Sequence, residues 1–246
     1  MEELYTTILL QEEYLLTSNK EYQLKLDSLN IEKIKLQLGR SSQLKVDQLS
    51  MTASELNKAI VGSKNSIQSL KGELNDIMGR EYDRELNLVP FEIPEEVEIP
   101  EYEALLSKAT KEYDAIPAIE RDIEKKEDDL DSLDDSDYQY DLMKLEVKEK
   151  ELQLQEEKYK LTKTINNLLT EVQAKQEEYQ LSLFNYKNAQ TNYDWDQKRF
   201  ELGRISKLDL MQSELNYLSA KDKNTAAGYS FYLAYRSLQL AEEGIL

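Results

Sequence analysis

Two stretches of the sequence place apolar residues at alternating spacings of three and four. This is the pattern of a helix that buries one face in a coiled coil. The first stretch carries the seam Val46, Leu49, Ala53, Leu56, Ile60, Ser63, Ile67, Leu70, Leu74 and Ile77. The second carries Ile165, Val172, Tyr179, Tyr186, Tyr193 and Phe200 seven apart, with Leu168 and Ala189 on the same face, and continues through Leu208, Met211, Leu215, Leu218, Tyr229 and Tyr232. Each pattern predicts long helices with a packed side. A tyrosine row could also indicate a ligand surface, but its heptad spacing favours core packing.

Glycine and proline positions divide the chain between these helices. Residues 2–38 and 138–202 contain neither and are expected to be helical, while Gly79 and Gly244 are expected to end helices. Residues 80–100 contain three prolines, which remove backbone donors and force the preceding residue to be extended. They predict an extended crossover, followed by short helices over 101–114 and from Pro117 to about 130.

A ten-residue turn sequence occurs twice. Residues 35–44 recur 164 positions later as residues 199–208, and in each copy a Gly-Arg pair separates two helical tracts. An internal repeat of this kind indicates one supersecondary unit used twice, here a helical hairpin with the turn at its tip. Ser42 and Ser206 are placed to cap the returning helices. Asp209 completes a capping box in the second copy, where the first copy has Lys45.

These patterns predict an all-α fold of two long antiparallel coiled-coil helical hairpins, related by an internal repeat and joined by a Pro-containing extended crossover. The expected parts are residues 1–79 with a tip at 38–42, a crossover and short helix over 80–116, and residues 117–246 with a tip at 202–206.

Composition excludes several function classes. The chain has 246 residues, a net charge of -18, and no cysteine or histidine. The acidic balance argues against nucleic-acid binding, and the missing residue types exclude thiol or Ser-His-Asp catalysis and Cys/His zinc sites. No enzyme, cofactor or metal is expected, because a thin coiled coil offers no pocket that perturbs a carboxylate pair.

Two further features concern calcium and membranes. Residues 127–137 hold seven acids but lack the calcium-loop spacing, so a solvated acidic connector is expected. No apolar run approaches the roughly 18 residues of a membrane span, and no signal segment precedes Glu2. We expect no direct membrane insertion by this chain.

The turns resemble those of the TolC family of outer-membrane efflux channels. That family carries two copies of a basic-aromatic-x-x-Gly turn followed by an aliphatic-rich helix with Asp and Gln. The second copy here reads Arg199-Phe200-Glu201-Leu202-Gly203 and then Leu208-Asp209-Leu210-Met211-Gln212, and the final helix from Tyr232 to Gly244 is also similar. The first copy departs from the pattern, because Leu36 stands at the aromatic position and Lys45 at the acidic one.

The resemblance implies a homotrimer of twelve helices around a hollow α-barrel, on the periplasmic side of the outer membrane in the cell envelope. It implies tip-to-tip docking with a periplasmic adaptor (membrane fusion) protein, together with an inner-membrane pump, in efflux or type I secretion. Carried over by position, the docking residues are Leu38, Gly39, Arg40, Ser41, Ser42, Leu202, Gly203, Arg204, Ile205 and Ser206, with Asp209 at the pore entrance. Arg40 and Arg204 also fit solvated arginines that interact with a helix C-terminus, and Asp209 also fits a simple cap.

Departures from the family keep other interpretations open. The strand pairs that build the family's β-barrel are not recognisable, so we expect the helical-hairpin region without them, as either an excised region or a natural relative. A structural coiled-coil scaffold would explain the seams but not the repeated turn. An adaptor-type hairpin protein should show one hairpin between Gly-rich β-domain halves, and this sequence shows two hairpins.

Overall fold

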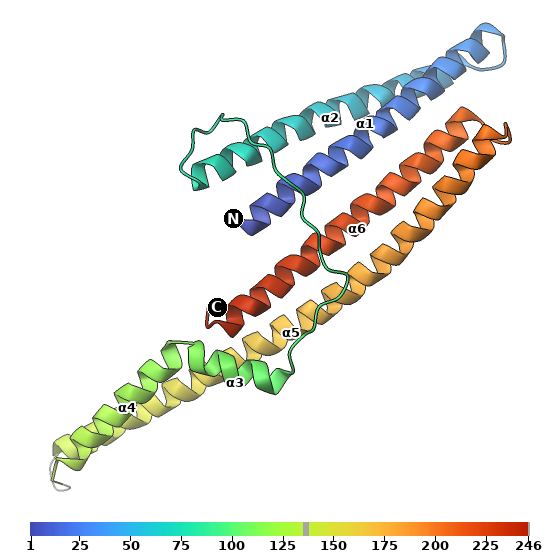
Figure 1. The fold of residues 1–246 in the computed structure, drawn as a ribbon. Helices are drawn as coiled ribbons and strands as arrows, with labels where there is room; N and C mark the ends of the chain where they lie inside the picture. Colours follow the sequence, from blue (N-terminus) through green and yellow to red (C-terminus); the bar gives the residue numbers. More distant parts are fainter. Residues whose placement is uncertain (135–137, 246) are drawn as a thin grey trace. The chain divides into compact units, whose positions relative to one another are not determined.

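The computed structural model describes residues 1–134 and 138–245 (Figure 1), and every regular element among them is a helix. The all-α prediction is confirmed. The six helices are α1 (Glu2–Gln37), α2 (Gln43–Ile77), α3 (Tyr102–Glu112), α4 (Ala115–Asp131), α5 (Tyr138–Glu201) and α6 (Lys207–Glu242). Backbone proximity groups the chain into two compact units. The first comprises Met1–Glu95 and Glu178–Ser230, and the second comprises Glu96–Glu177 and Phe231–Leu246.

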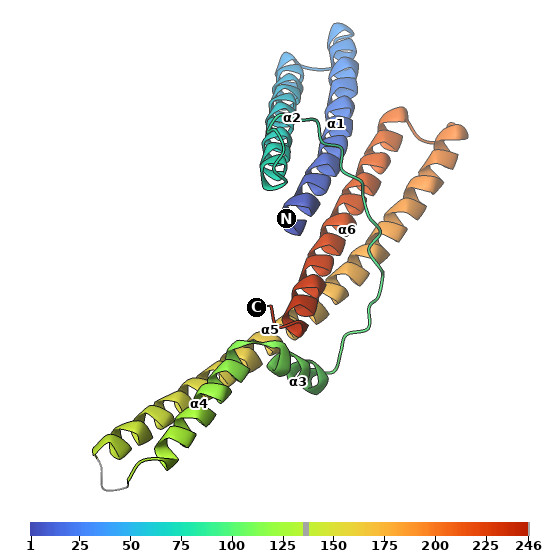
Figure 2. The ribbon, with the colours of Figure 1, turned by 60° about the vertical axis from the view of Figure 1, so that its left-hand side comes forward.

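In the first unit, α1 and α2 form an antiparallel hairpin (Figure 2). Every second position of the predicted α2 seam is buried, as Val46, Ala53, Ile60, Ile67 and Leu74. The alternate positions Leu49, Leu56, Ser63 and Leu70 are only partly buried. One line of the seam therefore packs on α1, while the other stays partly open in the single chain.

The second hairpin of this unit pairs the last part of α5 with the first part of α6. Tyr217 of α6 stacks on Tyr186 and Tyr193 of α5, with ring centroids 5.7 and 5.5 Å apart. Ser182 Oγ donates to Asn224 Oδ1 across the same pair of helices (3.1 Å). The tyrosine row is thus packing surface, as its spacing predicted. The hydrogen bond with the Tyr217 hydroxyl and, to a smaller extent, burial raise the pKa of Tyr186 to about 12.

A ladder of ion pairs joins the two hairpins along α1 and α6. Its three rungs are Asp27–Lys207 (2.8 Å), Lys20–Glu214 (2.7 Å) and Glu13–Lys221 (2.5 Å). Rungs are seven residues apart on both helices and alternate in sign along each, so they match in only one antiparallel register. Because α1 contacts both α2 and α6, and α6 contacts α5, the helices of this unit follow the order α2, α1, α6, α5.

The crossover after α2 runs without regular structure, as its prolines predicted. Its part in the first unit is held by side chains from three helices. The Tyr5 hydroxyl of α1 donates to the carbonyl of Val89 (2.8 Å), and the Tyr179 hydroxyl of α5 donates to that of Ile93 (3.4 Å). The ring of Phe91 lies 5.4 Å from that of Tyr229 of α6.

In the second unit, α4 lies beside the first half of α5. Ion pairs join Lys126 to Glu146, Lys150 to Asp122 (3.3 Å) and Lys158 to Glu120 (2.7 Å). This helix pair was not foreseen, because a seam does not specify its partner. The acidic connector prediction needs correction, since Glu127, Asp128, Asp129 and Asp131 belong to the end of α4. Residues 132–134 follow α4 without helical structure, and residues 135–137 lie outside the described residues.

Candidate functional site at the hairpin tips

Both tips are built by the same backbone device. Gly39 and Gly203 have φ of +69° and +66°, a conformation that glycine adopts without a Cβ penalty. The glycine N–H groups donate to Leu36 and Phe200, and those of Arg40 and Arg204 donate to Lys35 and Arg199, at 2.8–2.9 Å. This pair of bonds is the Schellman motif, which satisfies the last carbonyls of the outgoing helix.

The same motif occurs at a helix end that is not a tip. Gly79 has a φ of +68°, and the following Arg80 donates its N–H to Asn75 at 2.9 Å. The Gly-Arg step is therefore a general helix stop in this chain. What distinguishes the tips is the set of side chains around the step.

At the first tip, a buried carboxylate connects the two helices. Glu32 of α1 has a side chain that is 7% exposed. It accepts from Ser41 Oγ (2.5 Å) and forms ion pairs with Lys45 and Lys35 (3.3 Å each). These three donors, Ser41 first among them, lower the pKa of Glu32 to about 2. The backbone N–H of Lys45 also donates to Ser42 Oγ (3.4 Å), which confirms the predicted cap.

At the second tip, the predicted capping box is confirmed. Ser206 donates its backbone N–H to Asp209 Oδ2 (3.0 Å), and Asp209 donates its own to Ser206 Oγ (3.2 Å). The Ser206 hydroxyl and backbone bonds lower the pKa of Asp209. Below the turn, Arg199 pairs with Asp196 at 2.8 Å.

The internal repeat extends to these side chains. Glu32 and Lys35 occupy the positions that Asp196 and Arg199 occupy in the second copy, and both pairs form ion pairs. Leu38 and Leu202, each directly before its glycine, are 65% and 66% exposed. The copies differ where Ser41 and Lys45 of the first tip correspond to Ile205 and Asp209 of the second.

The structure places all eleven predicted site residues at the tips. Residues 38–42 form the first turn, residues 202–206 form the second, and Asp209 lies exposed in the first turn of α6. The ladder between α1 and α6 brings both turns to the same end of the first unit. Sequence reasoning missed Glu32. Its position, equivalent to Asp196 in the repeat, was the signal that could have identified it.

Other parts of the described chain offer weaker sites. A cavity of about 450 Å³ lies in the first unit, where Leu88, Pro90 and Phe91 of the crossover pass over α1, α5 and α6. Its charged lining residues Glu12, Glu13 and Lys221 are already engaged in ion pairs. Within residues 1–134 and 138–245, no cluster of acidic side chains is arranged to hold a metal ion. None of the helices described there combines the length and apolar character needed to cross a membrane.

The comparisons with known proteins rest on structure. No protein-family model matches the sequence, and the search of curated proteins finds no match. The fold matches CusC, a protein described by its transmembrane channel formation, at 13% identity with a TM-score of 0.73; the match covers 99% of this chain and 75% of that one. It also matches the outer membrane protein VceC of Vibrio cholerae (15% identity, 98% and 68% covered, TM-score 0.62).

A third match is the outer membrane channel CmeC of Campylobacter jejuni, at 15% identity with a TM-score of 0.61. It covers 99% of this chain and 61% of that one, so this chain spans about three fifths to three quarters of the lengths of these three proteins. The identities are too low to say more than that the architecture is shared. The chain has the fold of the helical, TolC-like portion of outer membrane factor channels.

Proposed function

We propose that this chain forms the helical wall of a TolC-like export conduit, in which three copies close into a tube and the hairpin tips dock on a periplasmic adaptor protein. One observation carries the proposal. Two hairpins lie side by side with both repeated tips at one end, in a fold shared with outer membrane channels. The coupled inner-membrane pump and the location on the periplasmic side of the outer membrane belong to the same proposal.

The edges of the first unit support assembly from several copies. Because α2 and α5 are its outer helices, each has one side on which no other helix of this unit lies among the described residues. Leu44 and Met51 on α2 are 67% and 61% exposed, and Phe184 and Trp195 on α5 are 62% and 61% exposed. Packing α2 of one copy against α5 of the next would bury these side chains, and repeating that contact around an axis closes a ring.

The mechanism of such a conduit is passive. A ring of three copies would have twelve helices in its wall, four from each copy (α1, α2, α5 and α6), and this wall would separate the transported substrate from its surroundings without a chemical step. The ladder between α1 and α6 is polar and partly exposed, whereas α2 packs on α1 through apolar side chains. Breaking the contact between the two hairpins would therefore cost less free energy than separating α2 from α1, so this contact would rearrange when the tube opens at its tips.

A structural scaffold is the second candidate. It is favoured by the third Gly-Arg step at Gly79-Arg80, which ends a helix away from the two repeated tips. A scaffold would not need exposed leucines at both tips.

Adaptor binding tests the proposal. The hairpin region of a membrane-fusion-type adaptor is titrated onto the chain and onto Arg40→Glu/Arg204→Glu, with binding measured by isothermal titration calorimetry. We expect the double variant to lose binding while its far-ultraviolet circular dichroism stays unchanged. Lys58→Glu/Lys64→Glu makes the same charge change at two exposed positions in the middle of α2 and should bind like the unmodified chain. Equal binding by all three proteins would contradict the docking role.

A further inference from the structure

The two tips carry different charges. Residues 30–46 hold four basic side chains (Lys33, Lys35, Arg40 and Lys45) and one carboxylate (Glu32). The equivalent residues 194–210 hold four basic side chains (Lys198, Arg199, Arg204 and Lys207) and four carboxylates (Asp194, Asp196, Glu201 and Asp209). The first tip is therefore distinctly positive, on a chain whose net charge is -18.

Within residues 30–46 the single carboxylate is hidden, and the next one, Asp47, accepts from Gln43 Nε2 (2.7 Å). Glu32 lies between the helices and accepts from Ser41, Lys35 and Lys45, so that little of its negative charge reaches the surface. The side chains of Lys35 and Lys45 remain 50% and 61% exposed. Lys33 and Arg40 are exposed and have no ion-pair partner among the described residues.

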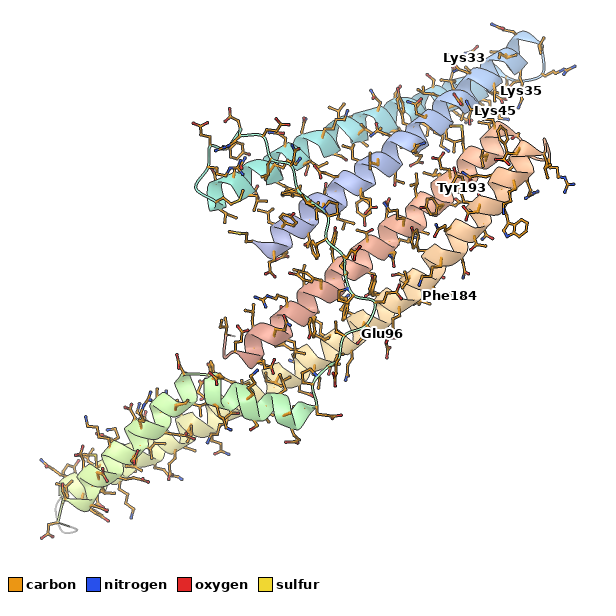
Figure 3. All side chains as sticks on the ribbon, in the orientation of Figure 1. Lys33, Lys35, Lys45, Glu96, Phe184 and Tyr193 are labelled. Carbon is orange, nitrogen blue, oxygen red and sulfur yellow. The ribbon has the colours of Figure 1, made fainter. Side chains whose placement is uncertain are left out.

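The first tip also projects past the second. The rung Asp27–Lys207 places these two residues at one level. Gly39 is twelve residues beyond Asp27, about 18 Å at the helical rise, whereas Gly203 is only four residues before Lys207, the first residue of α6. Figure 3 shows Lys33, Lys35 and Lys45 at the tip end of the first hairpin.

We propose that this basic tip, formed by Lys33, Lys35, Arg40 and Lys45, binds a carboxylate-rich segment of a partner protein. Leu38 and Leu44, 65% and 67% exposed, would pack on apolar side chains of the same segment. The basic residues occupy both helices as well as the turn, so a segment that wraps the end of the hairpin reaches all four. If a flat anionic membrane contacted the turn at Gly39, Lys33 would lie about 9 Å from the membrane surface. That distance is comparable to the screening length, so Lys33 would be attracted only weakly.

The inference depends on the proposed function only for the partner's identity as an adaptor. The second tip, with balanced charges, would then meet a neutral part of that adaptor. Around a ring of three copies, basic first tips and charge-balanced second tips would alternate. An acidic segment of the adaptor would therefore bind only at every second tip.

A fluorescein-labelled peptide of ten glutamates is a probe that needs no identified partner. Its binding is followed by fluorescence anisotropy at low ionic strength for the unmodified chain and for Lys33→Gln/Arg40→Gln, which leaves the Glu32 contacts intact. Lys198→Gln/Arg204→Gln removes the same number of charges from the second tip and is the matched control. We expect the first variant to bind about tenfold more weakly and the control to bind like the unmodified chain, with binding weakening as salt is added.

Three results would overturn the inference. They are no binding of the peptide to the unmodified chain, equal weakening by both variants, and retention of the chain by phosphatidylglycerol vesicles without binding of the peptide. Failure of the adaptor experiment with a positive peptide result would reject the conduit but keep the acidic partner. The opposite outcome would keep the conduit and reject the charge-based recognition.

Discussion

Two glycines in α2 allow a matched test of how the crossover is attached to the first hairpin. A Cβ added at Gly72 would lie 2.2–2.6 Å from three ring carbons of Tyr82, whereas Gly62 has no such neighbour within 4 Å. Asn75 Nδ2 donates to the carbonyls of Arg84 (2.7 Å) and Tyr82 (3.3 Å). The ring and the amide together hold the start of the crossover on α2.

We expect alanine to have opposite effects at the two positions. Replacing a glycine inside a helix stabilises by about 0.5–1 kcal/mol, and Gly62→Ala should show this gain. In Gly72→Ala the ring must move by more than about 1 Å to reach an ordinary carbon contact. Tyr82 is 48% exposed, so displacing its ring loses about half of the hydrophobic free energy that a fully buried side chain would contribute, roughly 1 kcal/mol. Straining the Asn75 bonds costs about another 1 kcal/mol. Gly72→Ala should therefore destabilise by about 1 kcal/mol.

Urea unfolding followed by circular dichroism measures both variants. The Tyr82→Ala background provides the internal control, because without the ring Gly72→Ala should stabilise as Gly62→Ala does. If Gly72→Ala raises the midpoint as much as Gly62→Ala in the unmodified background, Tyr82 does not cover Gly72 and the reasoning is refuted.

Three further predictions concern charged groups. Reversing the charges on the α1 side of the ladder (Glu13→Lys, Lys20→Glu, Asp27→Lys) should lower the free energy of unfolding by about 1–3 kcal/mol, because the lysine side chains are 42–71% exposed and each exposed pair contributes about 0.2–1 kcal/mol. Adding the matching reversals on α6 (Lys207→Glu, Glu214→Lys, Lys221→Glu) should restore the melting temperature. Failure to restore it would disprove the register of α1 against α6. Ser41, Lys45 and Lys35 lower the pKa of Glu32 to about 2, so the stabilising effect of this carboxylate is present above its unfolded pKa and disappears as pH falls to about 2. Glu32→Gln should therefore lower the melting temperature at pH 7, and this deficit should shrink between about pH 4 and 2. A deficit that stays constant over that range would contradict the assigned contacts. Asp222 is 5% exposed, one of its carboxylate oxygens has no hydrogen-bond partner, and burial raises its pKa. Asp222→Asn should therefore raise the melting temperature at neutral pH, and the gain should vanish in acid, where the carboxyl group is protonated. A lowered melting temperature would show that the fold needs the carboxylate.

Helix boundaries and tips could be predicted because they depend on local chemistry. Gly39, Gly79, Gly203 and Gly244 all take the positive φ that ends a helix, and the prolines of the crossover prevent a helix there whatever surrounds them. The α2 seam was equally clear, because α2 buries one face against one neighbour.

Pairing between distant helices could not be predicted in the same way. Helix α1 shows no clean seam, and the reason is that it contacts α2 on one side and α6 on another, which spreads its buried residues around the helix. The first half of α5 pairs with α4 through ion pairs between exposed residues, a pattern that in sequence resembles any solvated helix.

The candidate site was found only in part for the same reason. The turn residues and caps follow from spacing, since Ser206 and Asp209 need only each other. Glu32 is nine residues from Ser41 and thirteen from Lys45, and only the folded tip brings these donors to it. The repeat marks the position of Glu32 through its equivalence to Asp196, but nothing in the sequence indicates that Glu32 is buried.

The mass of the chain in solution, measured by multi-angle light scattering over a range of concentrations, shows whether three copies assemble. If three copies close into a ring, we expect a species near three times the chain mass of 28.7 kDa, whose share increases relative to the single chain as concentration rises. Met51→Glu/Phe184→Glu, which charges both open edges, should stay at the mass of one chain. A single-chain mass at every concentration, or a trimer that the edge variant leaves intact, would contradict the closed ring of hairpins.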